Sequence, residues 1–249
     1  GSITVVDVAA QQEIPCAVNE DFAYSDAGRV EWVITHPAHT EYLLRFSTAP
    51  ERRLPAPAAC TPLIGVGDLL RYNVGAPAPV VVPHPGALAD LTGDGQRDLV
   101  GAWNYAYRPG WPWDGIVCYP AVDEGAFTFG DLVRVRYSEG DTFHHFSSIY
   151  MTGDFADVTG DGLVDLVYSP SRGDVIELFR NTGRRDAGSM PVFVPDGTLA
   201  RPAGAWNPCR AVDLDQDGAV DIVVGQPAAA DQPEPAEVFF IRNTNPDGW

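Results

Sequence analysis

The sequence contains no lysine and is poor in positive charge. All 16 of its basic residues are arginine, against 34 acidic residues, which leaves a formal net charge of -18. Proteins that bind nucleic acid through its phosphate backbone depend on clustered positive charge. We therefore expect no nucleic-acid partner.

Long hydrophobic runs are also missing. No apolar stretch approaches the roughly 18 residues that span a bilayer, so we expect no membrane partner. Sequence patterns of a helical protein are missing too, because the apolar residues alternate or form short runs without a helical period. The chain has 22 prolines and 25 glycines between these runs. This punctuation predicts an all-β protein, and a hydrophobic content of 45% is enough for a core.

What the sequence does contain is an acidic loop. Residues 89–100 read ADLTGDGQRDLV and place Asp90, Asp94 and Asp98 within nine positions. Two carboxylates about 4 Å apart repel by about 4 kcal/mol at an effective dielectric of 20. Oxygen donors at alternate positions of a glycine-bearing turn suit a hard cation such as calcium. The loop therefore predicts a calcium site, although another divalent ion is an alternative.

The acidic loop recurs twice, as DVTGDGLVD from Asp157 and DLDQDGAVD from Asp213. The loops are spaced by 157 − 90 = 67 and 213 − 157 = 56 residues, which is typical of repeat proteins. A strand that ends in Arg-Asn-Thr follows both the second and the third loop. A fainter first unit begins at Ser25. We therefore predict one domain over residues 1–249 with four units, at roughly 9–75, 76–140, 141–200 and 201–249.

The pattern D-x-T-G-D-G-x-x-D-L-V resembles the FG-GAP or VCBS repeat of integrin-like propellers. The resemblance implies an all-β, β-propeller fold of four-stranded blades, in which calcium-binding loops join the first two strands of each blade. It also implies structural Ca²⁺ held at alternate loop positions, with these candidate ligands: Asp90, Thr92, Asp94, Gln96 and Asp98; Asp157, Thr159, Asp161, Leu163 and Asp165; Asp213, Asp215, Asp217, Ala219 and Asp221. Thr92 and Thr159 replace an acid, which predicts weaker first and second sites.

About four blades are visible, and the last stops at Trp249 where its outer strand would begin. Two explanations remain open. Residues 3–8 supply the missing strand and close the ring, or the chain is part of a larger propeller completed by a further chain or segment.

Cysteine is scarce. Cys16, Cys60, Cys118 and Cys209 occur singly, without the C-x-x-C spacing of a zinc site. Four cysteines allow two disulfides in any of three pairings, or four buried free thiols. An even number of cysteines beside calcium-type loops favours an oxidising compartment, and we expect a secreted or periplasmic protein.

Histidine and aromatic residues gather on the connections predicted to lie opposite the acidic loops. The five histidines are His36, His39, His84, His144 and His145. The same face should receive tryptophans and asparagines, and aromatic rings beside polar donors suit a carbohydrate-binding surface. The candidate substrate-binding residues are Trp103, Asn104, Trp111, Trp113, Trp206 and Asn207. For each residue alone, a structural role is the alternative.

Some propellers with this repeat are polysaccharide lyases that act on uronic-acid glycans such as ulvan, and the chain looks like that group in its His, Tyr and Arg content. An arginine would neutralise the uronate carboxylate, and a histidine or tyrosine would transfer the protons of β-elimination. The candidate catalytic residues are His84, His144, His145, Tyr107, Tyr150, Arg108 and Arg172. The expected partner is therefore an acidic polysaccharide.

Two other functions remain open. A glycoside hydrolase needs two carboxylates flanking its cleft, and Asp114 and Asp174 lie on suitable connections. A non-catalytic module would present the same face to a glycan or a protein without turnover.

Overall fold

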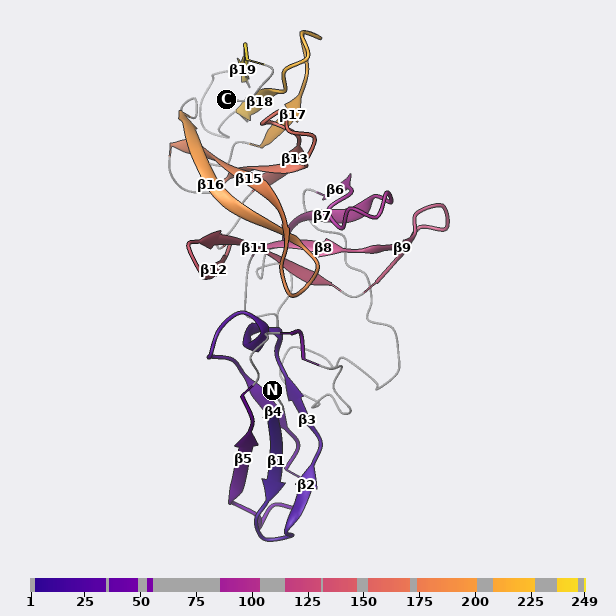
Figure 1. Ribbon diagram of the computed structural model, residues 1–249, viewed down its shortest axis with the longest axis vertical. Coiled ribbons are helices and arrows are strands. Elements are labelled where there is room, and N and C mark those ends of the chain that lie inside the picture. Colours follow the sequence, from indigo (N-terminus) through magenta and orange to yellow (C-terminus); the bar gives the residue numbers. More distant parts are fainter. Residues whose placement is uncertain are drawn as a thin grey trace, which may run out of the picture. The chain divides into compact units, whose positions relative to one another are not determined.

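The structure is a computed structural model of the chain (Figure 1). It divides into two compact units, Gly1–Ala78 and Pro79–Trp249. The residues that the structure describes are 3–34, 36–48, 53–55, 86–103, 115–130, 132–146, 152–170, 174–200, 208–226, 237–245 and 249, with the side chains of Trp103 and Gln226 left out.

The described part of the first unit consists of five short strands and one 3-10 helix. β1 (Ile3–Asp7) is the middle strand of an antiparallel sheet with β2 (Gln12–Ile14) and β5 (Tyr42–Phe46). β3 (Cys16–Val18) pairs with β4 (Val30–Trp32), and η1 (Glu20–Ala23) lies between them. Both edges of β1 therefore have partners within this unit.

The second unit begins with two four-stranded antiparallel groups. The first comprises β6 (Gly86–Ala89), β7 (Asp98–Trp103), β8 (Gly115–Tyr119) and β11 (Val133–Glu139). The second comprises β13 (Thr152–Ala156), β14 (Asp165–Ser169), β15 (Val175–Arg185) and β16 (Pro191–Ala200). A parallel bridge between Tyr137 and Phe193 joins the groups into one sheet, and β12 (Thr142–His145) extends it as a hairpin partner of β11.

This sheet curls until it is nearly a closed barrel, because β13 at one end lies against β6 and β7 at the other. Its interior is apolar and includes Ile116, Leu166, Phe179 and Phe193, all at most 4% exposed. Gly153 on β13 marks the close approach, since an added Cβ would lie 3.4 Å from Ile116 Cδ1. Burial of these side chains stabilises each by about 1.5–3 kcal/mol relative to exposure.

The last described sheet has three antiparallel strands, β17 (Cys209–Val212), β18 (Asp221–Gln226) and β19 (Glu237–Ile241). Ile222 and Val224 pack with Val167 and Ile176 of the preceding group in a second apolar cluster. The Asp154 carboxylate on β13 also accepts a hydrogen bond from Ala211 N–H at 2.7 Å. A short hairpin of β9 (Ala121–Asp123) and β10 (Thr128–Phe129) completes the described strands.

The predicted all-β class is confirmed, since the described residues contain strands and one 3-10 helix but no α-helix. Among these residues, no helix is long and apolar enough to cross a bilayer. The four-stranded unit is observed twice, at β6–β7–β8–β11 and at β13–β14–β15–β16. The described part of the first unit differs: its strands form sheets of three and two, and it lacks the acidic loop that joins the first two strands elsewhere.

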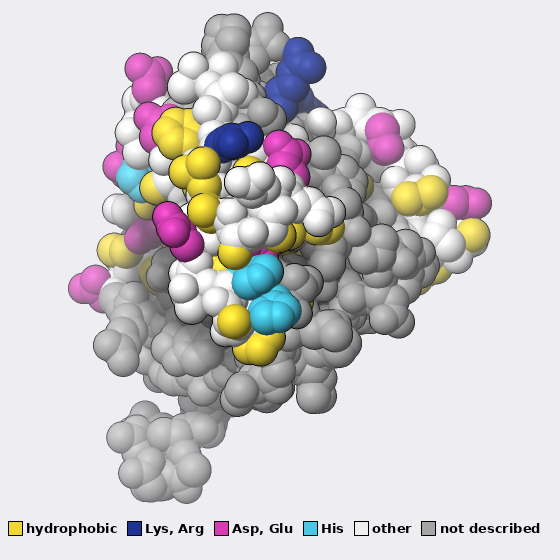
Figure 2. Space-filling model, turned by 90° about the horizontal axis from the view of Figure 1, so that it is seen from below, with side chains coloured by type: hydrophobic (Ala, Val, Ile, Leu, Met, Phe, Trp, Pro, Cys, Tyr) yellow, Lys and Arg dark blue, Asp and Glu magenta, His cyan; other side chains and the backbone are white. Residues whose placement is uncertain are grey.

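Exposed apolar side chains are interspersed with charged ones on the surface. Phe46 on β5 is 76% exposed and Val238 on β19 is 73% exposed. Figure 2 shows one face of the molecule, on which hydrophobic side chains lie beside acidic and histidine side chains. Single exposed apolar residues are normal on protein surfaces, and we assign these no role.

Three of the four cysteines are free thiols, namely Cys16, Cys118 and Cys209, and Cys60 lies outside the described residues. Cys118 and Cys209 are completely buried. Burial raises the pKa of both, that of Cys209 to about 11. Only the thiolate reacts with alkylating agents, so both thiols should be inert in the folded protein.

We expect iodoacetamide at pH 8 to leave Cys118 and Cys209 unmodified in the folded protein and to modify both in denaturant. With a pKa of about 11, only about 0.1% of Cys209 would be thiolate at that pH. Cys16 is only partly buried and is the internal control. Peptide mapping by mass spectrometry measures each site, and modification of Cys209 as fast as Cys16 would contradict the burial described here.

Candidate metal centres

The three acidic loops each join the first and second strands of a group, as predicted. They connect β6 to β7, β13 to β14 and β17 to β18, and each connected pair is antiparallel. The ninth residue of each loop is the first residue of the second strand. The loops therefore lie at the start of a buried strand, which fixes their last carboxylate in the core.

This last carboxylate belongs to Asp98, Asp165 and Asp221, each 0% exposed. In every loop it accepts a hydrogen bond from the N–H that follows the first loop residue, and from an N–H within or just after the third strand of the group. For Asp165 these donors are Val158 at 3.1 Å and Asn181 at 2.8 Å. The corresponding donors are Leu91 and Ala121 for Asp98, and Leu214 and Asn243 for Asp221.

The first carboxylate of each loop accepts hydrogen bonds from the backbone of the turn that follows it. Asp157 accepts from the N–H groups of Gly160, Asp161 and Gly162 at 2.8–3.1 Å. Asp90 accepts from the equivalent three N–H groups of the first loop, and Asp213 from those of Asp217 and Gly218. The side chain thus satisfies backbone donors that a sharp turn leaves without partners.

The backbone of the three loops has the same left-handed positions. The sixth residue is Gly95, Gly162 or Gly218, with φ of 87°, 85° and 93°. No atom lies within 4 Å of a Cβ added to any of them, so this backbone angle is what favours glycine there. The fourth residue is also left-handed, although in the third loop it is Gln216, with φ of 63°.

The other predicted ligand positions support the loop in ways that the sequence did not show. The Thr159 hydroxyl donates to Asp165 Oδ2 at 2.9 Å, and the Thr92 hydroxyl lies 3.4 Å from Asp98 Oδ1. At the seventh position, the N–H groups of Gln96, Leu163 and Ala219 donate to the fifth-position carboxylates of Asp94, Asp161 and Asp217 at 2.9–3.0 Å.

Carboxylate oxygens converge most clearly in the third loop. Asp213, Asp215 and Asp221 each offer an oxygen, and these atoms all lie within 4.8 Å of one another. Hard divalent cations take several oxygen ligands at about 2.3–2.6 Å. The donor set therefore fits calcium, with carboxylates from opposite ends of the loop facing one another.

The electrostatics of individual loop carboxylates differ. Burial raises the pKa of Asp165, and the hydrogen bonds from Asn181 and Thr159 act against that rise. The pKa of Asp217 is lowered by the Ala219 N–H and by Arg242. In the first loop, Arg97 lies beside Glu124 and the Arg97 N–H donates to the same carboxylate at 2.9 Å, and these contacts hold the pKa of Glu124 below its ordinary value.

Comparison with known families supports this geometry. Residues 157–224, from the first aspartate of the second loop to β18, match the FG-GAP-like repeat family. This segment is therefore similar to an FG-GAP-like repeat. No curated protein matches the chain in sequence. With the FG-GAP-like repeat and the nearly closed sheet, the predicted fold is confirmed as all-β and propeller-like.

Most of the predicted catalytic and substrate-binding residues lie outside the described part of the chain. These are His84, Asn104, Tyr107, Arg108, Trp111, Trp113, Tyr150, Arg172, Trp206 and Asn207, together with the side chain of Trp103 at the end of β7 and with Asp114 of the hydrolase alternative. Asp174 is exposed and precedes β15. The predicted grouping of these residues on one face stays a prediction.

His144 and His145 lie within strand β12, although we expected them on a connection. Backbone pairing with β11 explains the difference, since His144 is opposite Tyr137 and His145 is opposite Arg136. The rings of His144 and Tyr137 stack with centroids 5.2 Å apart. The two histidine side chains therefore point to opposite faces of the sheet.

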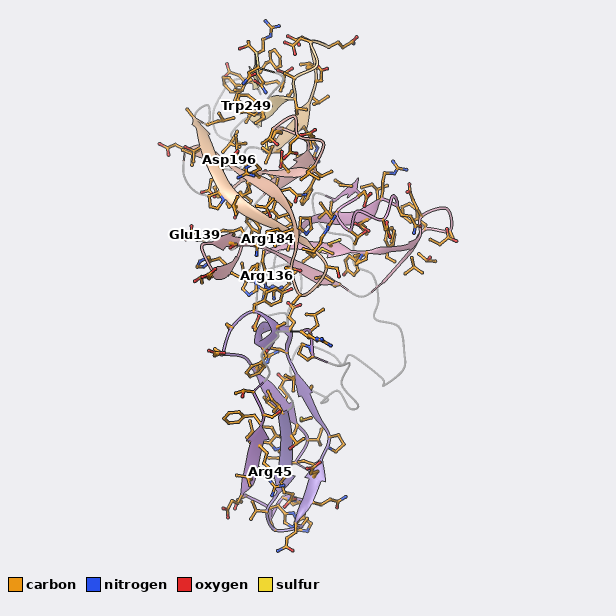
Figure 3. All side chains as sticks on the ribbon, in the orientation of Figure 1. Arg45, Arg136, Glu139, Arg184, Asp196 and Trp249 are labelled. Carbon is orange, nitrogen blue, oxygen red and sulfur yellow. The ribbon has the colours of Figure 1, made fainter. Side chains whose placement is uncertain are left out.

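The sequence analysis missed two buried arginines on β11. Arg136 is 1% exposed and Arg134 is 9% exposed, and Arg136 Nη1 donates to the Arg134 carbonyl at 3.2 Å. Figure 3 labels Arg136 on this part of the sheet. Strand alternation places both arginines on the face opposite Val135 and Tyr137, which face the apolar core. The V-R-V-R alternation by itself predicts exposed arginines, so the sequence pattern did not indicate that they are buried.

In the first unit, His36 and His39 lie on the connection between β4 and β5, as expected. Their rings stack with centroids 4.4 Å apart. His39 Nδ1 lies 2.6 Å from Asp7 Oδ2, and Asp7 is 2% exposed. The Ala10 N–H and His39 lower the pKa of Asp7, so this pair explains the position of His39 without a catalytic role.

Proposed function

We propose that the chain is a calcium-stabilised, propeller-like module of a secreted or periplasmic protein. The observation that carries this proposal is the hydrogen-bond geometry that the three loops share, with a buried last aspartate and a turn-forming first aspartate; in the third loop, oxygens of Asp213, Asp215 and Asp221 lie within 4.8 Å of one another. Three carboxylates this close repel one another, and a divalent cation removes the repulsion. The ion would be structural and would hold the first two strands of each group together.

Isothermal titration calorimetry of chelator-treated protein with CaCl₂ tests the proposal. We expect saturable binding that weakens in the triple variant D94N/D161N/D217N. These three aspartates are exposed and accept the seventh-position N–H, which an asparagine oxygen can still do. Equal binding by the variant and the wild type would contradict the proposal.

A second candidate function, action on acidic polysaccharide, is favoured by the partly exposed His145 and by the His, Tyr and Arg content of the sequence. Arg136 is opposite His145 in the β11–β12 register but is 1% exposed, so a glycan would meet His145 and not Arg136. Arginine binds carboxylates bidentately, and a histidine beside a bound uronate is suited to proton transfer. We propose a uronate-containing glycan as partner, either cleaved by β-elimination or bound without turnover.

Product chemistry separates these outcomes. Incubation with a panel of acidic polysaccharides should produce ultraviolet absorbance from new double bonds if the chain is a lyase. The variant H84A/H145A should then lose this signal, while H36A, an exposed histidine in the first unit, should keep it. Affinity without products supports the binding module, and new reducing ends without double bonds support the hydrolase. No affinity and no products would contradict a glycan function.

A further inference from the structure

We propose that Arg242 is a built-in competitor for the cation of the third loop. Its guanidinium bridges two carboxylates of that loop: Arg242 Nε lies 2.6 Å from Asp215 Oδ2, and Arg242 Nη2 lies 3.0 Å from Asp217 Oδ2. Asp215 is also one of the three residues whose carboxylate oxygens converge. This inference depends on the proposed calcium binding and concerns how one site is set apart from the other two.

The backbone fixes Arg242 at the loop. Arg242 follows β19 directly, and the next residue, Asn243, donates its N–H to the buried Asp221 at 2.9 Å. Asp221 in turn accepts the Leu214 N–H of the same loop. The arginine is therefore tied through one residue to the carboxylate that anchors the site, and its side chain reaches the solvent-facing carboxylates of Asp215 and Asp217.

The second loop provides a comparison, because the same Arg-Asn-Thr sequence follows it, but its arginine pairs with a residue outside the loop. Arg180 precedes Asn181, whose N–H donates to the buried Asp165 at 2.8 Å, just as Asn243 donates to Asp221. Arg180 Nε nevertheless lies 3.6 Å from Asp196 Oδ1 of β16, a residue labelled in Figure 3.

The residue at the third position within each loop explains this difference. It is Thr159 in the second loop and Asp215 in the third, so only the third loop offers a carboxylate there. In the first loop, the residue that precedes the equivalent N–H donor Ala121 is Pro120, which carries no charge. The extra acid of the third loop is therefore matched by a guanidinium that bridges two of its carboxylates, whereas the guanidinium at the first loop, Arg185, contacts the Leu91 carbonyl.

Two consequences follow for the third loop. Without a metal ion, the guanidinium reduces repulsion among four aspartates, so the loop can keep its shape. With a metal ion, Asp215 must ligate a cation while a second positive charge lies 2.6 Å from its Oδ2. The third site should therefore not bind calcium most tightly, although it has four carboxylates. The sequence alone predicts the opposite order of calcium affinity, with weaker first and second sites.

Calcium titrations of the wild type, R242Q and R180Q test this inference. We expect one class of site to tighten by about two- to five-fold in R242Q, the size of effect typical of an exposed ion pair, while R180Q, the matched control, binds as the wild type does. The double variant R242Q/D213N should lose the tightened class, which assigns it to the third loop. In chelator, R242Q should melt below R180Q, because the loop has lost its internal cation.

The outcomes separate the inference from the proposed function. Calcium binding by the wild type without tightening in R242Q would overturn the inference alone. Binding by R242Q at a site that is silent in the wild type would support it strongly. If neither protein binds calcium, both the proposed function and this inference are wrong.

Discussion

Replacing Asp165 by alanine should lower the melting temperature by about 10–20 °C in the presence of chelator. The side chain is fully buried and accepts from the N–H groups of Val158, Thr159 and Asn181 and from the Thr159 hydroxyl. Each buried donor left without a partner costs about 1–3 kcal/mol. A total of roughly 3–6 kcal/mol corresponds to such a shift, at about 2–4 °C per kcal/mol for a chain of this size.

Two variants sharpen this measurement by circular dichroism. D165N keeps one acceptor oxygen and should lose about half as much stability as D165A. D161N is the matched control in the same loop, since Asp161 is exposed and its carboxylate accepts the Leu163 N–H, which an asparagine oxygen can still accept. Its melting temperature in chelator should stay within a few degrees of the wild type. Equal melting of D165A and D161N would show that the buried carboxylate does not anchor the loop.

Adding calcium to chelator-treated protein should raise the melting temperature by roughly 15 °C or more. A ligand at 100 times its dissociation constant stabilises the folded state by about 2.7 kcal/mol per site, or about 8 kcal/mol for three independent sites. Dissociation constants of 10⁻⁴–10⁻³ M are common in extracellular calcium modules, so a 100-fold excess corresponds to about 10–100 mM calcium. The effect should saturate with calcium concentration.

Magnesium is the control for this stabilisation. It is smaller, demands a nearly octahedral shell and gives up its water reluctantly, so equal concentrations should stabilise the protein less. The triple variant D94N/D161N/D217N controls for effects of calcium away from the loops. A melting temperature that calcium leaves unchanged would contradict a structural role for the ion.

The acidic loops were predictable because their determinants are local. Carboxylates at the first, fifth and ninth positions, with glycine at the sixth, specify a turn whose donors and acceptors lie within nine residues. The structure adds that Asp98, Asp165 and Asp221 also accept from the next segment of the chain, at Ala121, Asn181 and Asn243. Those bonds depend on strand register, which no local pattern encodes.

Other features depended on contacts between distant residues and were missed. Arg242 was recognised only as part of a repeated strand ending, since its pairing with Asp215 and Asp217 follows from the β18–β19 register. His144 and His145 were expected on a connection, yet they pair with β11 as a strand. Arg134 and Arg136 resemble the exposed half of an alternating strand, and only the folded sheet shows that both are buried.

Equilibrium dialysis of chelator-treated protein against calcium tests the central claim most directly, because it counts ions per chain. The three loops predict three bound calcium ions at saturation. Substituting one loop at its fifth position, with D94N, D161N or D217N, should weaken one ion and leave the other two. If no calcium is bound at millimolar concentrations, the result would show that these carboxylates only accept hydrogen bonds from the protein backbone.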